Sequence, residues 1–462
     1  MSKHAPLTER KYVLPFVLVT SLFFLWSIGV NLNDVLIPHL KKTFDLSDFQ
    51  SSFIQVAFFG GYFLAAFPAG RLMEKIGYKK GILFGLLICA TGTLLFLPAA
   101  SSRTYSFFLF ALFVMSCGQS FLEVGANPYV TVLGPAESSE RRLNFAQSFN
   151  AVGAALVPTL GAAFVLSGIE YTPAQRAAMT AERLRAYIAS ETNTVRGPYV
   201  AVTALFLLVA ALIYFAHLPE VQVEEGHANA GKEGGTLPDL MAHGHLVKGV
   251  IAQFFYVGAQ VGVASFVIRF VKFTVPQTLD HMAAWGLNFG AQNSQGFLAQ
   301  LMPTSPEKMA ALFLVAHQVG FMIGRFAGSW MMKSIAASRL LATFALCALI
   351  CTLVAIGAPG IVAVLAIVLV GFFNSIMFPT IFALSLKNLG GLTKRGSSLL
   401  VMSIIGGALI PAAMGRISDA SNIRTAFLAP LVCYAYVIYF AIWGYQPKTV
   451  AIPGTQAEAT SL

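Results

Sequence analysis

The stretch YSFFLFALFVMSCGQSFLEVGANPYVTVL, residues 105–133, decides the fold class. Its only charged residue is Glu123, and most of the others are apolar. A helix needs about 20 mainly apolar residues to cross the hydrocarbon core of a bilayer. We therefore expect residues 105–133 to form a membrane-spanning helix that carries an acid inside it.

The rest of the chain has a similar composition. Of its 462 residues, 56% are hydrophobic and 11% are charged, whereas soluble domains carry about 25% charged residues. The sequence therefore predicts an all-α membrane protein with twelve transmembrane helices and no soluble domain. The expected spans are 12–37, 49–72, 81–100, 105–133, 143–168, 197–217, 246–275, 308–332, 340–357, 360–386, 396–416 and 425–445.

Basic residues set the expected orientation in the membrane. Residues 1–11 are polar, and the apolar run after them is too long for a signal-peptide core, so we expect a retained first helix. The densest basic cluster then faces the cytoplasm, as the positive-inside rule requires; it comprises Arg71, Lys75, Lys79 and Lys80. Both termini are expected to be cytoplasmic. We interpret the net charge of +10 as topology and lipid contact, not as nucleic-acid binding.

A polar segment, residues 218–245, divides the chain into two halves. It contains Glu, Gly and His without apolar periodicity, which indicates a flexible cytoplasmic linker between residues 1–217 and 246–462. The halves share three short matches in nearly one register, which predicts a duplicated six-helix unit. In this register Asn374 corresponds to Glu123. The matches are GAALVP (153–158) with GGALIP (406–411), AGRLMEK (69–75) with AGSWMMK (327–333), and NP (127–128) with FP (378–379).

Two acids lie where burial is costly: Asp34 and Glu123. An ionised acid at bilayer depth costs roughly 2.5–3.5 kcal/mol, so it usually faces a protein interior or a wet cavity. Desolvation favours the neutral acid, which makes proton uptake near neutral pH feasible. Asn31 shares a helix face with Asp34, as Asn127 does with Glu123. We predict that both acids take part in cation coupling and that Asp34 also binds the solute. The alternative for each is a structural acid satisfied by a neighbouring helix.

Amides beside aromatic rings indicate the kind of solute. Gln147 and Asn150 lie three residues apart in the fifth apolar run, and Tyr256 and Gln260 lie four apart in the seventh. Rings stack on the apolar face of a sugar while amides bind its hydroxyls, so the pattern favours an uncharged polyhydroxylated ligand. Any one of these side chains could instead serve only as an interhelical hydrogen-bonding group.

Four other polar residues lie inside apolar runs. His317 is interpreted as a satisfied core histidine; the alternative is that it and Gln318 touch the ligand or relay a proton. Arg269 and Arg325 lie near the expected membrane faces, where they can snorkel, and we assign them gating or structural roles. The five cysteines lack paired spacing and are expected to pack as small apolar residues. Because P-loop, metal-ligand and nucleophile motifs are absent, we expect neither an enzyme nor a bound metal or cofactor.

The segment GRLMEKIGYKK (70–80) resembles the loop between helices 2 and 3 of the major facilitator superfamily. From about residue 12 to residue 445, the chain further resembles the fucose:proton symporter family of that superfamily. The motifs that carry this resemblance are SLFFLW (21–26), NLND (31–34), LEVGANP (122–128), TVLGP (131–135), RLNFAQ (142–147), YVGAQ (256–260), FPTIF (378–382) and LKNLG (386–390).

The resemblance implies a major facilitator fold of twelve helices in two pseudo-symmetric halves. It also implies proton-driven import of a monosaccharide across the bacterial inner membrane. In that family the residues that match Asp34 and Glu123 are implicated in sugar binding and proton coupling. Those that match Asn31, Gln147 and Asn150 line the cavity of the first half.

Two departures from the family leave the particular sugar open. Phe378 stands where the fucose carrier has Tyr, which removes a hydroxyl from the expected cavity. Residues 276–306 form a longer segment, which we expect to cover the sugar entrance. The sugar can be a hexose, a deoxyhexose or an N-acetylhexosamine. The expected substrate-binding residues are Asn31, Asp34, Asn127, Gln147, Asn150, Tyr256, Gln260, Asn374 and Phe378.

Other functions fit the same fold. They are a sodium-coupled sugar symporter, an efflux antiporter for drugs or sugars, and a sugar-sensing receptor. A drug exporter would usually have a more apolar cavity than these amides provide.

We expect a monomer in contact with membrane lipids that needs no cofactor beyond the coupling ion, which is a proton or Na⁺.

Overall fold

The structure, a computed structural model, describes most of the chain. The described residues are 5–44, 48–102, 104–165, 175, 178–183, 186–187, 189, 196–219, 237–292 and 305–447. Within these ranges the side chains of 32–43, 48–49, 51–52, 158–165, 237, 285–292 and 307–308 are not described.

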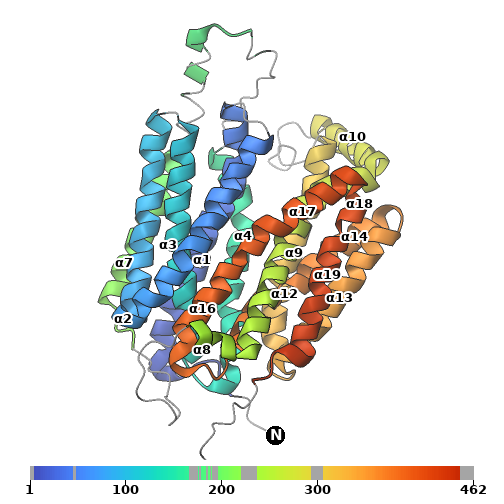
Figure 1. The fold of residues 1–462 in the computed structure, drawn as a ribbon. Coiled ribbons are helices and arrows are strands. Elements are labelled where there is room, and N and C mark those ends of the chain that lie inside the picture. Colours follow the sequence, from blue (N-terminus) through green and yellow to red (C-terminus); the bar gives the residue numbers. More distant parts are fainter. Residues whose placement is uncertain are drawn as a thin grey trace, which may run out of the picture.

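The first half is built from long helices that follow the predicted apolar runs (Figure 1). Short 3₁₀ turns precede α1 and α4. The elements are η1 (Arg10–Tyr12), α1 (Val13–Phe44), α2 (Asp48–Ser102), α3 (Tyr105–Val132), η2 (Ala136–Ser138), α4 (Ser139–Val165) and α7 (Arg196–Phe215).

The second half repeats this plan with more interruptions. Its elements are α8 (Leu237–Ala242), α9 (Gly244–Thr274), α10 (Pro276–Gln292), α12 (Pro306–Met331), α13 (Ala337–Gly357), α14 (Gly360–Asn374), α15 (Met377–Ser385), η3 (Gly390–Leu392), α16 (Thr393–Met402), η4 (Ser403–Ile405), α17 (Gly406–Ala420), α18 (Ile423–Ala426), α19 (Leu428–Tyr439) and η5 (Phe440–Gly444).

The all-helical membrane architecture is confirmed, although the predicted count of twelve spans is confirmed only in part. In the described ranges, ten helices are long and apolar enough to cross a membrane. One of them, α2, covers two predicted spans. It consists of two helices that meet at Gly77, whose positive φ of 81° is not helical and is readily adopted by glycine. Helix α4 covers the fifth predicted span but is not among the ten.

Two parts of the predicted connections are helical. Helix α8 occupies the end of the expected linker, so residues 218–245 are not wholly irregular. Helix α10 forms the first part of the segment 276–306. The middle of the linker and residues 293–304 lie outside the described residues.

Small residues let the helices of the first half approach closely. A Cβ on Gly92 of α2 would collide with the backbone of Met115 in α3, and one on Gly118 of α3 would collide with Cys89 of α2. Close backbone approach of this kind is typical of helix packing in membranes. It fixes α3, and with it the candidate site, against α2.

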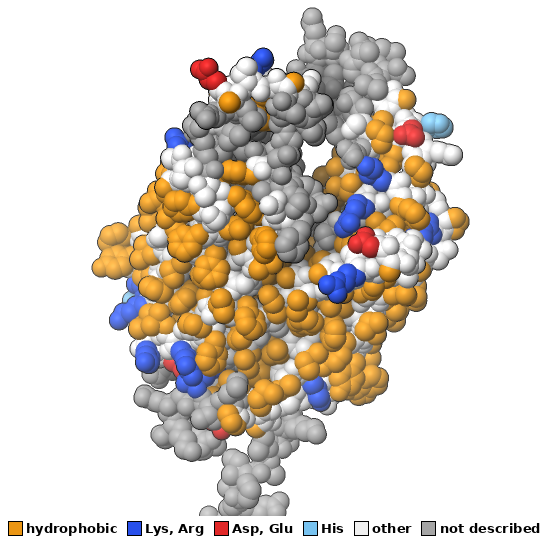
Figure 2. Space-filling model, turned by 45° about the horizontal axis from the view of Figure 1, so that its top comes forward, with side chains coloured by type: hydrophobic (Ala, Val, Ile, Leu, Met, Phe, Trp, Pro, Cys, Tyr) orange, Lys and Arg blue, Asp and Glu red, His pale blue; other side chains and the backbone are white. Residues whose placement is uncertain are grey.

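The outer surface fits a lipid environment. Large apolar side chains such as Leu14, Phe215 and Trp330 are well exposed. Figure 2 shows a broad field of apolar side chains over the middle of the visible face, with Lys and Arg mostly towards its margins. All five cysteines are free, as expected for packing residues.

The two halves are bonded to each other at the end of the bundle where the N-terminal segment lies, which we call the closed end (Figure 1). Glu140 at the start of α4 pairs with Lys387, which follows α15. Glu74 Oε1 lies 2.7 Å from Arg395 Nε of α16. Slightly deeper, Asn144 Nδ2 donates to Thr380 Oγ1 at 3.0 Å.

Pro128 contributes to this boundary through the backbone. Proline has no N–H, so the carbonyl four residues earlier, that of Val124, loses its helical partner. Ser397 Oγ of α16 donates to that carbonyl at 3.0 Å. The proline that interrupts the α3 hydrogen-bond ladder thereby creates a bond between the halves.

Candidate functional site

Glu123 lies in the inner part of α3 and is the charged group around which the site is arranged. It is 8% exposed, and its Oε2 has no hydrogen-bond partner among the described residues. The carboxylate is close enough to Arg325 of the other half for their charges to attract. One turn on, Asn127 Nδ2 donates to the Glu123 carbonyl at 3.1 Å. A buried carboxyl with a free oxygen can accept a proton or an incoming hydroxyl donor.

A chain of amide and guanidinium groups crosses from one half to the other beside Glu123. Gln147 Nε2 of α4 donates to Asn127 Oδ1 at 2.8 Å. Arg325 Nη1 of α12 donates to Gln147 Oε1 at 2.8 Å and to the Gln147 carbonyl at 2.6 Å. Arg325 Nε donates to the Ser375 carbonyl at 2.8 Å. The predicted site residues Asn127 and Gln147 are thus joined directly, and Arg325 fastens them to the second half.

The prediction that Arg325 snorkels to a membrane face is wrong, because the side chain is 3% exposed. Burying a guanidinium is costly unless its donors are satisfied. Carbonyls on both sides satisfy them here, and the group lies 4.8 Å from the centre of the Phe321 ring. One signal in the sequence could have identified Arg325. It is a cation inside an apolar run of the second half, and both buried acids lie in the first half, so a side chain that faces the first half would be expected.

Tyr256, Asn374 and Phe378 come together in the second half. The Tyr256 hydroxyl donates to the Asn374 carbonyl at 3.0 Å, and the rings of Tyr256 and Phe378 lie 6.4 Å apart. Both amide atoms of Asn374 lack partners among the described residues, as do those of buried Gln253, one turn before Tyr256 on α9. Gln260, one turn after Tyr256, is partly exposed.

Asn31 and Asn150 meet through Ser27. Asn31 Nδ2 donates to the Ser27 carbonyl at 2.7 Å and to Ser27 Oγ at 2.9 Å. Ser27 Oγ in turn donates to the Asn150 carbonyl at 2.8 Å, which joins α1 to α4. The side chain of Asp34 lies outside the described residues, so its predicted role is not tested.

Gln119 holds the helices behind Glu123 together. It is fully buried, and its Nε2 donates to the Trp26 carbonyl of α1 at 3.4 Å. The Tyr62 hydroxyl of α2 donates to Gln119 Oε1, also at 3.4 Å. Because Gln119 lies one turn before Glu123, these two bonds fix that part of α3 against its neighbours.

His317 is a satisfied core histidine, as we expected from the sequence. It is 1% exposed, and its Nδ1 lies 3.1 Å from the Ile367 carbonyl, which satisfies it within the second half. In the described part of the chain, no group of three His, Cys, Asp or Glu side chains could hold a metal ion.

Comparison with known proteins places this geometry in a family. Residues 19–403 match the family model of the Major Facilitator Superfamily. The chain is 40% identical to the L-fucose-proton symporter of Escherichia coli over 445 residues, which cover 96% of this chain and 95% of the relative. It is 38% identical to the glucose/galactose transporter of Brucella abortus over 437 residues, which cover 95% of each chain.

A solved structure extends the comparison to the fold. The major facilitator transporter FucP in its outward conformation superposes with a TM-score of 0.81 at 39% identity. The match covers 95% of this chain and 100% of that one.

Proposed function

This chain belongs to the major facilitator superfamily, and we propose that it imports a neutral monosaccharide together with a proton. It is a multi-pass membrane transporter and not an enzyme. Its relatives are named as a fucose-proton symporter and a glucose/galactose transporter. The observation that carries the proposal is the free Glu123 oxygen beside an amide chain that joins both halves.

The polar groups of the site suit an uncharged sugar. Asn127, Gln147 and Asn374 supply neutral amide donors and acceptors, which can bind hydroxyls without requiring a charged ligand. Tyr256 and Phe378 supply rings that can contact the apolar face of a pyranose. A hexose, a deoxyhexose or an N-acetylhexosamine would fit this chemistry.

Glu123 is the proposed proton site, with Asp34 as its partner in sugar binding. Protonated Glu123 is neutral and tolerates burial, whereas the ionised form disfavours closure around an empty site. A ligand shifts a conformational equilibrium only by its differential affinity for the two states. If sugar binds better when Glu123 is protonated, the movements of sugar and proton are linked.

We infer that the protein is in a state that is closed towards the cytoplasm and open outwards. The described ion pairs between the halves and the bond from Asn144 to Thr380 lie at the closed end, and the similar FucP structure is in an outward conformation. We propose that the closed end is cytoplasmic, that both termini lie on that side of the bacterial inner membrane, and that the protein works as a monomer.

Uptake into membrane vesicles tests the proposal. A panel of labelled hexoses, deoxyhexoses and N-acetylhexosamines is offered under an imposed pH gradient, under a Na⁺ gradient and under neither. We expect at least one sugar to accumulate with the pH gradient alone. Accumulation that requires Na⁺, or expulsion of the sugar by an inward proton gradient, would contradict the proposal.

A further inference from the structure

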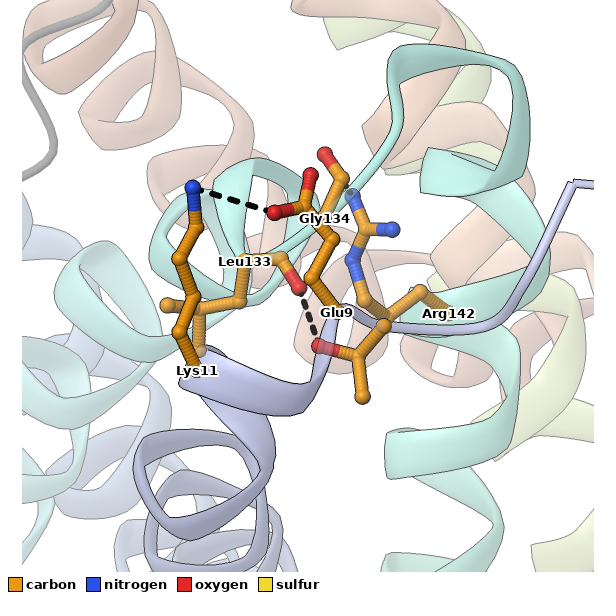
Figure 3. A network of polar contacts seen from close by, with 6 residues as sticks. Glu9, Lys11, Leu133, Gly134 and Arg142 are labelled. Atoms are coloured by element: carbon orange, nitrogen blue, oxygen red, sulfur yellow. Dashed lines mark hydrogen bonds and ion pairs between the residues drawn. The ribbon is translucent and has the colours of Figure 1, made fainter.

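The segment formed by residues 5–9, which we call the N-terminal clip, docks against the turn between α3 and α4. Thr8 Oγ1 donates to the Leu133 carbonyl at 2.6 Å. Figure 3 shows Leu133, Gly134 and Arg142 of this region together with Glu9 of the clip. Arg141 Nη2 donates to the Ala5 carbonyl at 3.0 Å. A segment that precedes the first membrane helix is therefore held against the start of the fifth predicted span.

Arg142 forms the centre of this contact. It is fully buried, and its Nη1 donates to the Leu7 carbonyl of the clip at 3.0 Å and to Ser138 Oγ at 2.9 Å. Its Nε donates to the Val130 carbonyl in the last turn of α3 at 2.7 Å. Helix carbonyls at a C-terminus lack helical partners and favour a cation. Arg142 therefore joins the end of α3, the start of α4 and the clip.

The internal repeat shows what is unusual about Arg142. In the register that pairs Gly153 with Gly406, Arg142 corresponds to Arg395. Arg395 forms an ion pair with Glu74 across the two halves. The repeat position that corresponds to Glu74 is Met332, which has no charge to offer Arg142. The clip and the α3 carbonyls satisfy Arg142 instead.

The clip is connected to the closed end through three consecutive residues. Glu140 pairs with Lys387 of the second half. Arg141 binds the clip through its side chain and accepts a hydrogen bond from Ser329 Oγ of α12 at its carbonyl, at 3.2 Å. Arg142 follows directly. The first turn of α4 thus bonds the clip on one side and the second half on the other.

We propose that the N-terminal clip is a conformational device that stabilises the state with this end closed. It holds the first turn of α4 in the position from which Glu140 and Arg141 reach the second half. When that end opens, the bonds of Glu140 and Arg141 to the second half must break. Loosening the clip lets the first turn of α4 shift, which weakens these bonds and makes the closed state less favourable. The inference assumes the alternating access of the proposed function, but its test needs neither sugar nor proton gradient.

The test measures the distance between spin labels on opposite halves at the closed end. Lys80→Cys in α2 and Ser334→Cys after α12 are exposed positions for the labels, in a chain whose native cysteines are replaced. Thr8→Val removes one hydrogen bond with little change in size, and Thr8→Ser keeps the hydroxyl as the matched control. A second variant lacks residues 5–9. Thermal unfolding of each variant confirms that the measured protein is folded.

For Thr8→Val, the ratio of long to short distances should rise by roughly two- to fivefold, the effect of one hydrogen bond of typical net strength. Deletion of residues 5–9 should increase it further, and Thr8→Ser should match the parent. An unchanged distance distribution in the folded deletion variant would overturn the proposal. A lower unfolding temperature without a change in distances would also overturn it, because the clip would then stabilise both states equally.

Discussion

At the scale of single residues, Arg325 determines how the candidate site is assembled. One guanidinium binds the Gln147 amide and carbonyl in the first half and the Ser375 carbonyl in the second. Arginine donates through a planar fork, a geometry that the ammonium group of lysine cannot reproduce. The position of Gln147, and through it that of Asn127, therefore depends on the identity of residue 325.

Arg325→Lys should accordingly weaken sugar binding by about tenfold or more. The charge remains, but a lysine can keep only part of the three bonds, and each bond to a charged group contributes about 1.5–3 kcal/mol. Calorimetric titration of the purified variant measures the affinity. Arg269→Lys is the matched control, because Arg269 is exposed and its guanidinium lies over the Phe266 ring. Equal affinities in the two variants would show that Arg325 does not organise the site.

At the scale of elements, the backbone conformation of the turn between α3 and α4 restricts which residue can occupy position 134. Gly134 has a φ of 150°. A Cβ placed on it would lie 2.8 Å from Arg142 Nη1 and 3.1 Å from Thr8 Cα. The close packing of the turn against Arg142 and the N-terminal clip therefore requires glycine at this position.

Gly134→Ala should lower the free energy of unfolding by about 1–3 kcal/mol, the usual cost of a residue in an unfavourable backbone conformation. Gly415→Ala in α17 is the control, since nothing described lies within 4 Å of its added Cβ. Alanine is favoured over glycine in a helix by roughly 0.5–1 kcal/mol, so the control should be neutral or stabilising. Thermal unfolding in detergent compares the two. A Gly134→Ala variant as stable as the control would contradict the described turn.

The elements also show how far the sequence could predict the structure. Apolar runs located the helices well, because a span needs a minimum length and that length is visible in the sequence. They could not show that the two helices of α2 meet directly at Gly77, or that α8 and α10 form within connections. The polar spacing joined Glu123 to Asn127 correctly. It could not pair Gln147 with Arg325, since contacts between distant helices depend on packing that periodicity does not encode.

At the scale of the whole molecule, the described ion pairs between the halves lie at one end of the bundle, and the N-terminal clip lies there too. A carrier with two rigid halves must break these bonds to open that end. Which side of the membrane the closed end faces depends on the topology, which the Lys and Arg distribution predicts.

The topology is tested with single cysteines placed in the linker, residues 218–245. We expect them to be protected from an impermeant thiol reagent added to intact cells and to react in inside-out vesicles. A cysteine in the 276–306 segment is the control and should show the opposite pattern. Linker labelling from outside intact cells would reverse the orientation, and the closed end would then face the periplasm.

Proton movement during sugar entry tests the central claim most directly. A pH electrode records the external medium when a transported sugar is added to de-energised vesicles, and a protonophore serves as the control. We predict that the medium becomes alkaline as sugar enters. In Glu123→Gln, which mimics the neutral acid, sugar counterflow should continue while the alkaline shift disappears. Sugar entry without any proton movement in the parent protein, or an unchanged alkaline shift in Glu123→Gln, would contradict the account.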